Sequence, residues 1–255
     1  MPDTADLQQK DYYELIRVVH ELAEDKKFAL YPLGDAKICS ESGMNPSGSR
    51  NSYIVLEEDT AVELGAPDKA SISMTMWTSH RGTLSNRLWT CGSDFERLEN
   101  KSVSYIQIIM LEFDDGSQAV ESDIVRIKNL TNKLPGFMTR SMQGKTWIRI
   151  SKERMNNGFS LYALGQCLHK AYMDTIPDIK GMDIILITDH NEFFKLLKPV
   201  SEAAKIISGD NTKFKWVSDG VVSCDELDCE NCDDKETCDS INEMLAKRKA
   251  MKKQN

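Results

Sequence analysis

The stretch that decides the fold is Asp183-Ile184-Ile185-Leu186-Ile187, followed by Thr188-Asp189-His190-Asn191-Glu192. A short, continuous apolar run such as 183–187 is typical of a strand buried on both faces. Asp189 is followed three residues later by Glu192, a pattern typical of a helix capping box. We therefore expect a buried strand over 183–187, with a helix starting at His190.

The preceding forty residues show the same alternation of strand and helix patterns. Thr146–Ile150 predicts a strand and Phe159–Tyr172 a helix. The helix that starts at His190 is expected to run towards Ser208 and to end at Gly209. Pro199 lies inside it and is expected to kink or divide it. Residues 146–208 should thus form strand, helix, strand and helix, packed on an upstream sheet.

The upstream part of the chain favours one amphipathic helix and several strands. Apolar residues within 7–26 recur at helical spacing. Segments rich in β-branched and aromatic residues predict strands at Ser52–Glu57, Thr60–Leu64, Ser71–Trp77, Ser102–Phe113 and Ile124–Ile127. The predicted fold class is α+β (mixed α/β), a sheet with packed helices. We expect a body over residues 1–215 and a cysteine-rich tail over 216–255.

Composition excludes several classes of function. The chain has 255 residues, of which 40% are hydrophobic, with a formal net charge of −8. An acidic chain without a long basic run in its body does not favour a nucleic-acid partner. No apolar run approaches the roughly 18–20 residues that span a bilayer, and residues 1–10 lack the apolar core of a signal peptide. We expect a soluble, cytoplasmic protein that binds neither nucleic acid nor membrane.

Four of the seven cysteines form a predicted metal site, Cys224, Cys229, Cys232 and Cys238, in the spacing C-x4-C-x2-C-x5-C. Four closely spaced thiolates suit either an iron–sulfur cluster or a tetrahedral zinc ion, and the spacing alone leaves both open. Eight carboxylate residues lie among or beside these cysteines, and negative charge near a cluster favours a low reduction potential. The other three, Cys39, Cys91 and Cys167, are expected to be small buried hydrophobic residues.

A longer series of residues resembles a known family. Trp147-Ile148-Arg149-Ile150-Ser151-Lys152-Glu153 leads through Gly158, Leu164-Gly165 and Ile176-Pro177-Asp178 to Ile187-Thr188-Asp189. This series resembles the middle region of acetyl-CoA synthase, the β subunit of the carbon monoxide dehydrogenase/acetyl-CoA synthase complex. The upstream segment Ala61-Val62-Glu63-Leu64-Gly65-Ala66-Pro67 looks like the start of the same region. The resemblance covers residues 50–210.

The resemblance implies a metal and a pathway. In the family, an iron–sulfur cubane bridged to two nickel ions follows this region, so an iron–sulfur cluster, preferentially [4Fe–4S], is favoured over zinc. The implied role is electron transfer or an accessory subunit in anaerobic one-carbon metabolism. The implied partner is carbon monoxide dehydrogenase, a corrinoid protein or a methyltransferase. Alternatives are a binding module stapled by zinc or a cluster, or a subunit that contributes to acyl or methyl transfer with a partner.

Two departures from the family limit these expectations. Only seventeen residues follow Cys238, and the later Cys-Gly-Cys-type pair that binds nickel is missing, so a complete acetyl-CoA synthase is not expected. The family also shows a Gly-Phe-Trp-His-Thr segment whose Trp is implicated in contacting coenzyme A. Here the matching stretch is Gly136-Phe137-Met138-Thr139-Arg140, in which Met138 replaces the indole. Arg149, Arg140 and Phe137 remain as a weakened candidate region for coenzyme A.

Overall fold

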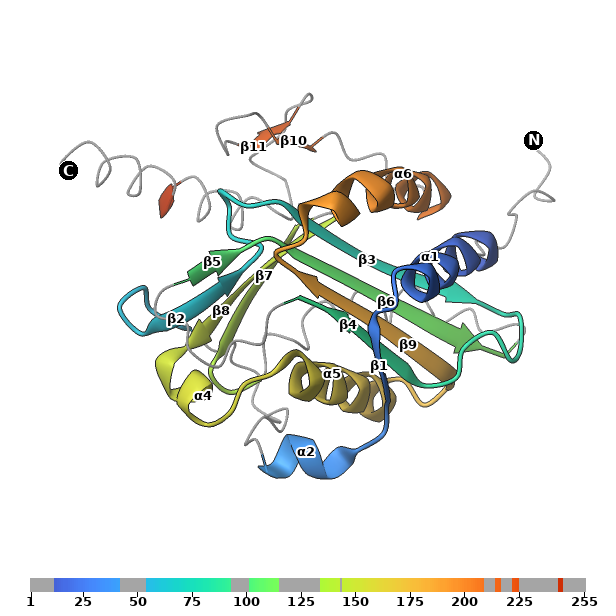
Figure 1. Ribbon diagram of the computed structural model, residues 1–255, viewed down its shortest axis with the longest axis horizontal. Helices are drawn as coiled ribbons and strands as arrows, with labels where there is room; N and C mark the ends of the chain where they lie inside the picture. Colours follow the sequence, from blue (N-terminus) through green and yellow to red (C-terminus); the bar gives the residue numbers. More distant parts are fainter. Residues whose placement is uncertain are drawn as a thin grey trace, which may run out of the picture.

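The structure of the chain, a computed structural model, describes residues 12–41, 54–92, 101–114, 134–142, 144–208, 214–216, 222–224 and 243–244. Its described strands form two mixed sheets and a short hairpin (Figure 1). The larger sheet has the strand order β1-β4-β9-β6-β3. Its strands are β1 (Ala29–Pro32), β3 (Ser71–Thr78), β4 (Arg87–Cys91), β6 (Tyr105–Phe113) and β9 (Ile179–Thr188).

Strand β9 forms the centre of this sheet. It pairs parallel with β4 and antiparallel with β6, while β3 adds to β6 in parallel. All nine residues of β6 are buried, as is every residue of β9 except Lys180. Burial of both faces explains why Ile184–Ile187 of β9 are continuously apolar instead of alternating with polar residues. The predicted buried strand at 183–187 is confirmed.

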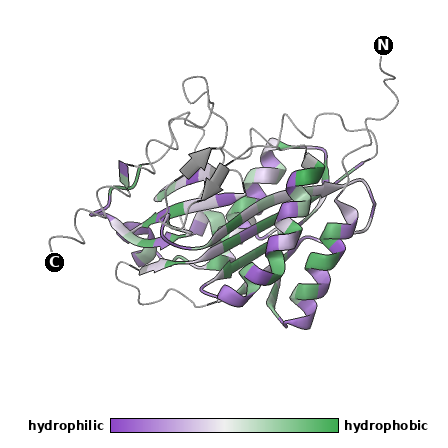
Figure 2. Cartoon of the chain, turned by 90° about the horizontal axis from the view of Figure 1, so that it is seen from above, coloured by the Kyte–Doolittle hydropathy of each residue, from purple (hydrophilic) through white to green (hydrophobic). Residues whose placement is uncertain are grey.

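Two helices, α1 (Tyr13–Asp25) and α6 (Asn191–Ser208), cover one face of the five-stranded sheet (Figure 1). Ile16 of α1 and Phe193 of α6 belong to the same core cluster as Ile108 and Ile185 of the sheet. Figure 2 shows both hydrophobic and hydrophilic residues along the helices, whereas the central strands are largely hydrophobic. Each helix therefore buries only one side, as its amphipathic sequence predicts.

The opposite face of the large sheet packs against helices and against the second sheet. The helices are α5 (Leu161–Thr175) and α2 (Ala36–Glu41). The second sheet has the order β5-β2-β8-β7, with β5 (Lys101–Val103), β2 (Thr60–Leu64), β8 (Lys145–Ser151) and β7 (Phe137–Met142). Leu168 of α5 and Ile148 of β8 share one core cluster with Ile109 and Leu186 of the large sheet. The second sheet thus has one face in the core and one outer face.

Helix α5 lies very close to the large sheet at Gly165. A Cβ atom at this position would lie 2.6 Å from both Cδ atoms of Leu88 in β4. Glycine inside a helix costs about 1 kcal/mol relative to alanine. Because any side chain here would have to displace Leu88, the close approach explains why the helix contains a glycine.

Most of the predicted elements are confirmed. The strands predicted at 60–64, 71–77 and 146–150 are β2, β3 and β8, and the helix at 159–172 is α5. The N-terminal helix is confirmed from Tyr13 onwards, and the strand predicted at Ile124–Ile127 lies outside the described residues. The short helix α4 (Lys152–Asn156) and strands β1, β4 and β7 were not predicted.

Three local predictions were wrong. Residues 54–57 form no strand. The single strand predicted over Ser102–Phe113 is two strands, β5 and β6, which lie in different sheets on either side of Ser104. Asp189 does not cap α6, because it has a left-handed backbone (φ 57°) and the helix begins two residues later, at Asn191. Pro199 lies within α6, which continues past it undivided.

Candidate functional site

The residues predicted to contact coenzyme A lie on the hairpin formed by β7 and β8. Phe137 pairs with Ile150, and Arg140 pairs with Trp147. Phe137 is 1% exposed, and its ring lies in the core beside Phe159, with 5.7 Å between the ring centroids. Since residue directions alternate along a strand, Arg140 points to the outer face. The structure therefore separates Phe137 from the arginine side of the hairpin.

Arg149 lies on the outer face of the second sheet and is nearly enclosed. Its Nε donates a hydrogen bond to Oε1 of Glu63 at 3.0 Å, and Nη1 donates to the Val55 carbonyl at 3.4 Å. The guanidinium carbon lies 4.9 Å from the centroid of the Trp147 ring, and Nη2 lies 3.2 Å from Sδ of Met244. A phosphate at Arg149 would have to compete with the Glu63 carboxylate.

The outer face also carries a small apolar cluster. Val55, Ala66, Met138 and Trp147 are buried there, with Met244 packed against them. Met138, which the resemblance predicts to replace a tryptophan of the family, is 6% exposed and directly opposite Arg149 in the β7–β8 pairing. Its thioether fills the space between strand and loop as a packing residue.

Most of the predicted four-cysteine site lies outside the described residues. The backbone of Cys224 ends β11 (Val222–Cys224), which pairs antiparallel with β10 (Phe214–Trp216). Cys229, Cys232 and Cys238 are outside the described part of the chain.

The described residues contain no second candidate metal site. Within them, no three side chains of His, Cys, Asp or Glu are grouped so that they could hold a metal ion. Cys39 and Cys167 are fully buried in the core, as predicted, whereas Cys91 is partly exposed. A hydrogen bond with the Cys167 thiol lowers the pKa of Cys39, against the effect of burial. None of the described helices is long and apolar enough to cross a membrane.

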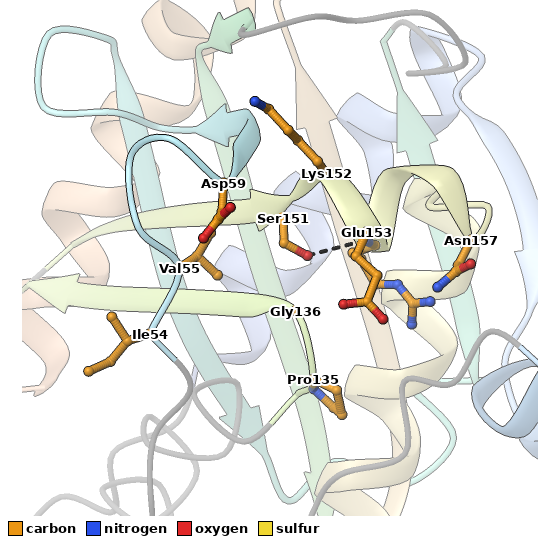
Figure 3. A pocket seen from close by; sticks show the side chains of 10 residues that line it. Ile54, Val55, Asp59, Pro135, Gly136, Ser151, Lys152, Glu153 and Asn157 are labelled. Atoms are coloured by element: carbon orange, nitrogen blue, oxygen red, sulfur yellow. Dashed lines mark hydrogen bonds between the residues drawn. The ribbon is translucent and has the colours of Figure 1, made fainter.

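A pocket of about 580 Å³ lies where β7, β8 and α4 meet (Figure 3). Its lining residues come from the loop before β2, the start of β7 and the end of β8 with α4: Ile54, Val55, Asp59, Pro135, Gly136, Ser151, Lys152, Glu153, Arg154 and Asn157. Ser151 lies centrally in Figure 3, where its Oγ accepts the hydrogen bond from the backbone N–H of Arg154 at 3.1 Å. This pocket was not predicted from the sequence.

Arg154 is the buried charge of the pocket. The residue is 6% exposed, and burial lowers the pKa of its guanidinium. In the sequence it stands in a polar stretch after a strand, which gives no sign of burial. The signal that could have drawn attention to it is the preceding Ser151, whose spacing to Arg154 is that of a helix cap.

Fold and site together define a class: a mixed α/β domain with two packed sheets, followed by a segment containing closely spaced cysteines. Residues 48–193 match the family model described as the CO dehydrogenase/acetyl-CoA synthase complex beta subunit. This match covers more than half of the chain. The chain belongs to this family.

The curated relatives are named as beta subunits of an acetyl-CoA decarbonylase/synthase complex. The chain is 23% identical over 152 residues to the acetyl-CoA decarbonylase/synthase complex subunit beta 1 of Methanocaldococcus jannaschii, which covers 58% of this chain and 20% of that protein. It is 24% identical over 162 residues to subunit beta 2 of the same organism, covering 62% and 33%. The corresponding subunit of Methanothermobacter thermautotrophicus is 30% identical over 77 residues, which cover 30% of this chain and 17% of that protein. The chain matches between about a sixth and a third of these relatives' lengths.

Proposed function

We propose that this chain is an iron–sulfur protein of anaerobic one-carbon metabolism that serves the carbon monoxide dehydrogenase/acetyl-CoA synthase system. Its role would be to transfer electrons or to act as an accessory subunit. The observation that carries the proposal is the position of the four cysteines, which follow a body that belongs to the beta-subunit family. The names of the curated relatives, all subunits of a complex, support a protein partner.

The donor set suits the proposed group. Four thiolates within fifteen residues, without a histidine among them, are ligands that a [4Fe–4S] cluster accepts. When bound, the cluster would supply one-electron redox chemistry. The surrounding carboxylates would disfavour its more negative, reduced state and so keep the potential low. We propose a body over 1–215 and a metal-binding tail over 216–255 on the same basis.

Two other functions remain to be separated from this one. Zinc also accepts four thiolates, and a structural zinc site would hold the tail together in a binding module without a redox role. A chain that contributes to acyl or methyl transfer would need nickel or a metal centre completed by a corrinoid protein, a methyltransferase or carbon monoxide dehydrogenase. Reversible reduction of the cluster distinguishes the first function from the zinc module. Nickel content distinguishes the partner-completed enzyme from both.

Coenzyme A is a further proposed ligand, with Arg149, Arg140 and Phe137 as the candidate region. Arg140 is the more available of the two arginines, because it is half-buried and its Nη1 makes one long hydrogen bond of 3.5 Å, to the Thr139 carbonyl. Arg149 is paired with Glu63, so its contribution depends on opening that pair. Arg140→Gln should weaken binding of coenzyme A in a titration if this region contacts the phosphates.

The deciding experiment is anaerobic purification of the full chain, followed by metal, sulfide and electron paramagnetic resonance analysis. We expect iron and acid-labile sulfide close to one cluster per chain, with a signal that appears on reduction. Stoichiometric zinc without sulfide in protein that was never exposed to air would contradict the iron–sulfur assignment. A bound cluster that cannot be reduced would support the iron–sulfur assignment and contradict the role in electron transfer.

A further inference from the structure

The side chain of Arg154 is a buried cation that lines the pocket beside α4. The residue is 6% exposed, and its backbone N–H, not its guanidinium, makes the hydrogen bond to Ser151. Among the described residues, no side chain or carbonyl forms a hydrogen bond or ion pair with the guanidinium. Such an arrangement is uncommon, because buried charges are normally paired.

Arg154 cannot escape the cost of burial by losing its proton. Burial lowers the pKa of this arginine, while the neighbouring Glu153 raises it again, and an arginine in a protein stays charged. Glu153 attracts the guanidinium at a distance but makes no ion pair with it within the described structure. An anion that enters from solution would therefore gain the attraction of a buried cation that forms no ion pair among the described residues.

The side chain is also held in place. Gly136 has a left-handed backbone (φ 77°), and a Cβ atom there would lie 3.0 Å from Cβ of Arg154 and 2.9 Å from Oγ of Ser151. The stem of Arg154 thus packs against the β7 turn. A preorganised arginine loses less conformational freedom when it binds an anion, and its planar fork matches carboxylate and phosphate oxygens.

The remaining lining determines the chemistry of the ligand. Asp59, Lys152 and Glu153 are exposed at the rim, and Lys152 extends away from Glu153 and Asn157 in Figure 3. The lining also includes three apolar residues, Ile54, Val55 and Pro135. A volume of about 580 Å³ is within the range of small-molecule sites.

We propose that this pocket binds a small organic anion, a carboxylate or a phosphate ester, with its charged group on the Arg154 guanidinium and its apolar part on Ile54, Val55 and Pro135. The proposal does not depend on the metal of the cysteine tail, since each of these residues belongs to the body. Because Val55 also accepts a hydrogen bond from Arg149, an occupied pocket lies directly beside the outer face of the second sheet.

The test uses the full chain, purified anaerobically, with two probes that share an apolar tail, butyrate and butyl phosphate. Binding is followed by calorimetric titration and by shifts of the Gly136 and Ser151 amide resonances, with chloride at equal ionic strength as the reference. We expect at least one probe to shift both resonances. The better of the two identifies whether the site prefers a carboxylate or a phosphate.

Arg154→Met keeps the aliphatic stem and removes the charge. We expect it to reduce the affinity for the preferred probe by about tenfold or more, because a charge-assisted pair is lost. It should leave the unfolding midpoint of the ligand-free protein unchanged or higher, since no partner is lost in the folded state. Arg17→Met, at an exposed arginine of α1 paired with Glu14 and Glu21, is the matched control and should bind like the wild type.

Two results would overturn the proposal. One is the absence of shifts at Gly136 and Ser151 with either probe, which would leave a pocket that holds only water. The other is an Arg154→Met protein that binds the probe as tightly as the wild type. The resonance shifts in the wild type remain informative even if the variant does not fold.

Discussion

Arg149 in β8 and Glu63 in β2 form a cross-strand ion pair whose Nε and Oε1 atoms are 3.0 Å apart, with side chains that are only 6% and 9% exposed. The two positions are 86 residues apart in sequence and become neighbours through the antiparallel register of the second sheet. Burial makes each charge depend on the other, because replacing either residue removes the 3.0 Å ion-pair partner of a side chain that is nearly enclosed.

Removing either member of this pair should destabilise the chain strongly. Arg149→Met and Glu63→Gln are each expected to lower the free energy of unfolding by about 3–5 kcal/mol, as for other broken buried pairs. The double variant should cost less than the sum of the two, since it leaves no unpaired charge. Glu57→Gln is the control. Its carboxylate is 3.9 Å from Arg149 and 52% exposed, so the loss should be below about 1 kcal/mol. Additive effects in denaturant unfolding would contradict the coupling.

The pKa of Asp183 predicts how the stability of the fold changes in acid. It is fully buried, with Oδ2 2.7 Å from Nη2 of Arg87 and 3.0 Å from Nε2 of His20. Burial raises the pKa of Asp183, but the close contact with His20 and the hydrogen bonds from Arg87 outweigh it and hold the pKa below its ordinary value. The stability that this carboxylate provides is therefore present above the unfolded pKa of about 3.9 and is lost as the pH falls towards the lower folded pKa.

Asp183→Asn should remove this stability at neutral pH and flatten the acid side of the stability curve. We expect a loss of about 3–5 kcal/mol at neutral pH, because Arg87 is left without its carboxylate. The loss should shrink as the pH falls below about 4, because the unfolded wild-type chain then binds a proton at this carboxyl and the folded protein does so only at lower pH. Asp174→Asn, at an exposed residue paired with Lys170, is the control and should change little. Unfolding curves measured across this pH range provide the check. Equal losses at all pH values would show that Asp183 contributes by shape alone.

The sequence predicted elements whose signals are local. The apolar run of β9 and the helical spacing of α5 depend only on neighbouring residues, and both are confirmed. Strand β1 was missed because all four of its residues are exposed at the sheet edge, so it lacks a buried face that would impose a pattern. The break at Ser104 was missed because only this one residue separates β5 from β6, although the two strands belong to different sheets.

The candidate site depends on contacts between distant segments, which explains why sequence reasoning found only part of it. Arg149 was selected as a phosphate contact, but its partner Glu63 is set by strand register. Arg154 was not selected at all, because its burial arises from the approach of Gly136 in the β7 turn. The four cysteines, by contrast, were recognised from spacing alone and stay a prediction, since three of them lie outside the described residues.

Lys145 should be an unusually reactive amine. Burial and the neighbouring Lys205 lower the pKa of Lys145 to about 7. About half of its amine is then neutral at neutral pH, against well under about 1% for a lysine with an ordinary pKa near 10.4. Acetic anhydride should acetylate Lys145 at least about tenfold faster than the exposed Lys198, as measured by peptide mass spectrometry. Lys205→Met should slow this labelling by raising the pKa of Lys145. Equal rates at Lys145 and Lys198 would contradict the lowered pKa.

The lowered pKa of Lys145 also predicts how the stability of the fold changes with pH. Its folded pKa lies below the unfolded value of about 10.4, so the cost of burying its charge is fully present below about pH 7. That cost is relieved as the pH rises from about 7 towards 10, because the unfolded chain then holds more protons. Lys145→Met should therefore stabilise the protein more at pH values near or below 7 than in alkaline solution.

Cys229 tests the proposed metal site without disturbing the body. In Cys229→Ser the serine hydroxyl is a poor ligand for iron, so iron and acid-labile sulfide should fall from about one cluster per chain to background. Because metal binding in short segments is coupled to their folding, the tail should lose order as well. The body should keep its unfolding midpoint, since no residue of its two large core clusters, or packed against them, lies beyond Ile207 in the sequence.

Cys91→Ser is the matched control for Cys229→Ser. Cys91 is a partly exposed thiol of β4 outside the proposed ligand set, so this variant should retain the full metal content. Metal and sulfide assays on both variants, prepared without exposure to air, give the answer. A Cys229→Ser protein that keeps its metal, or a Cys91→Ser protein that loses it to the same extent, would show that the cluster is held elsewhere.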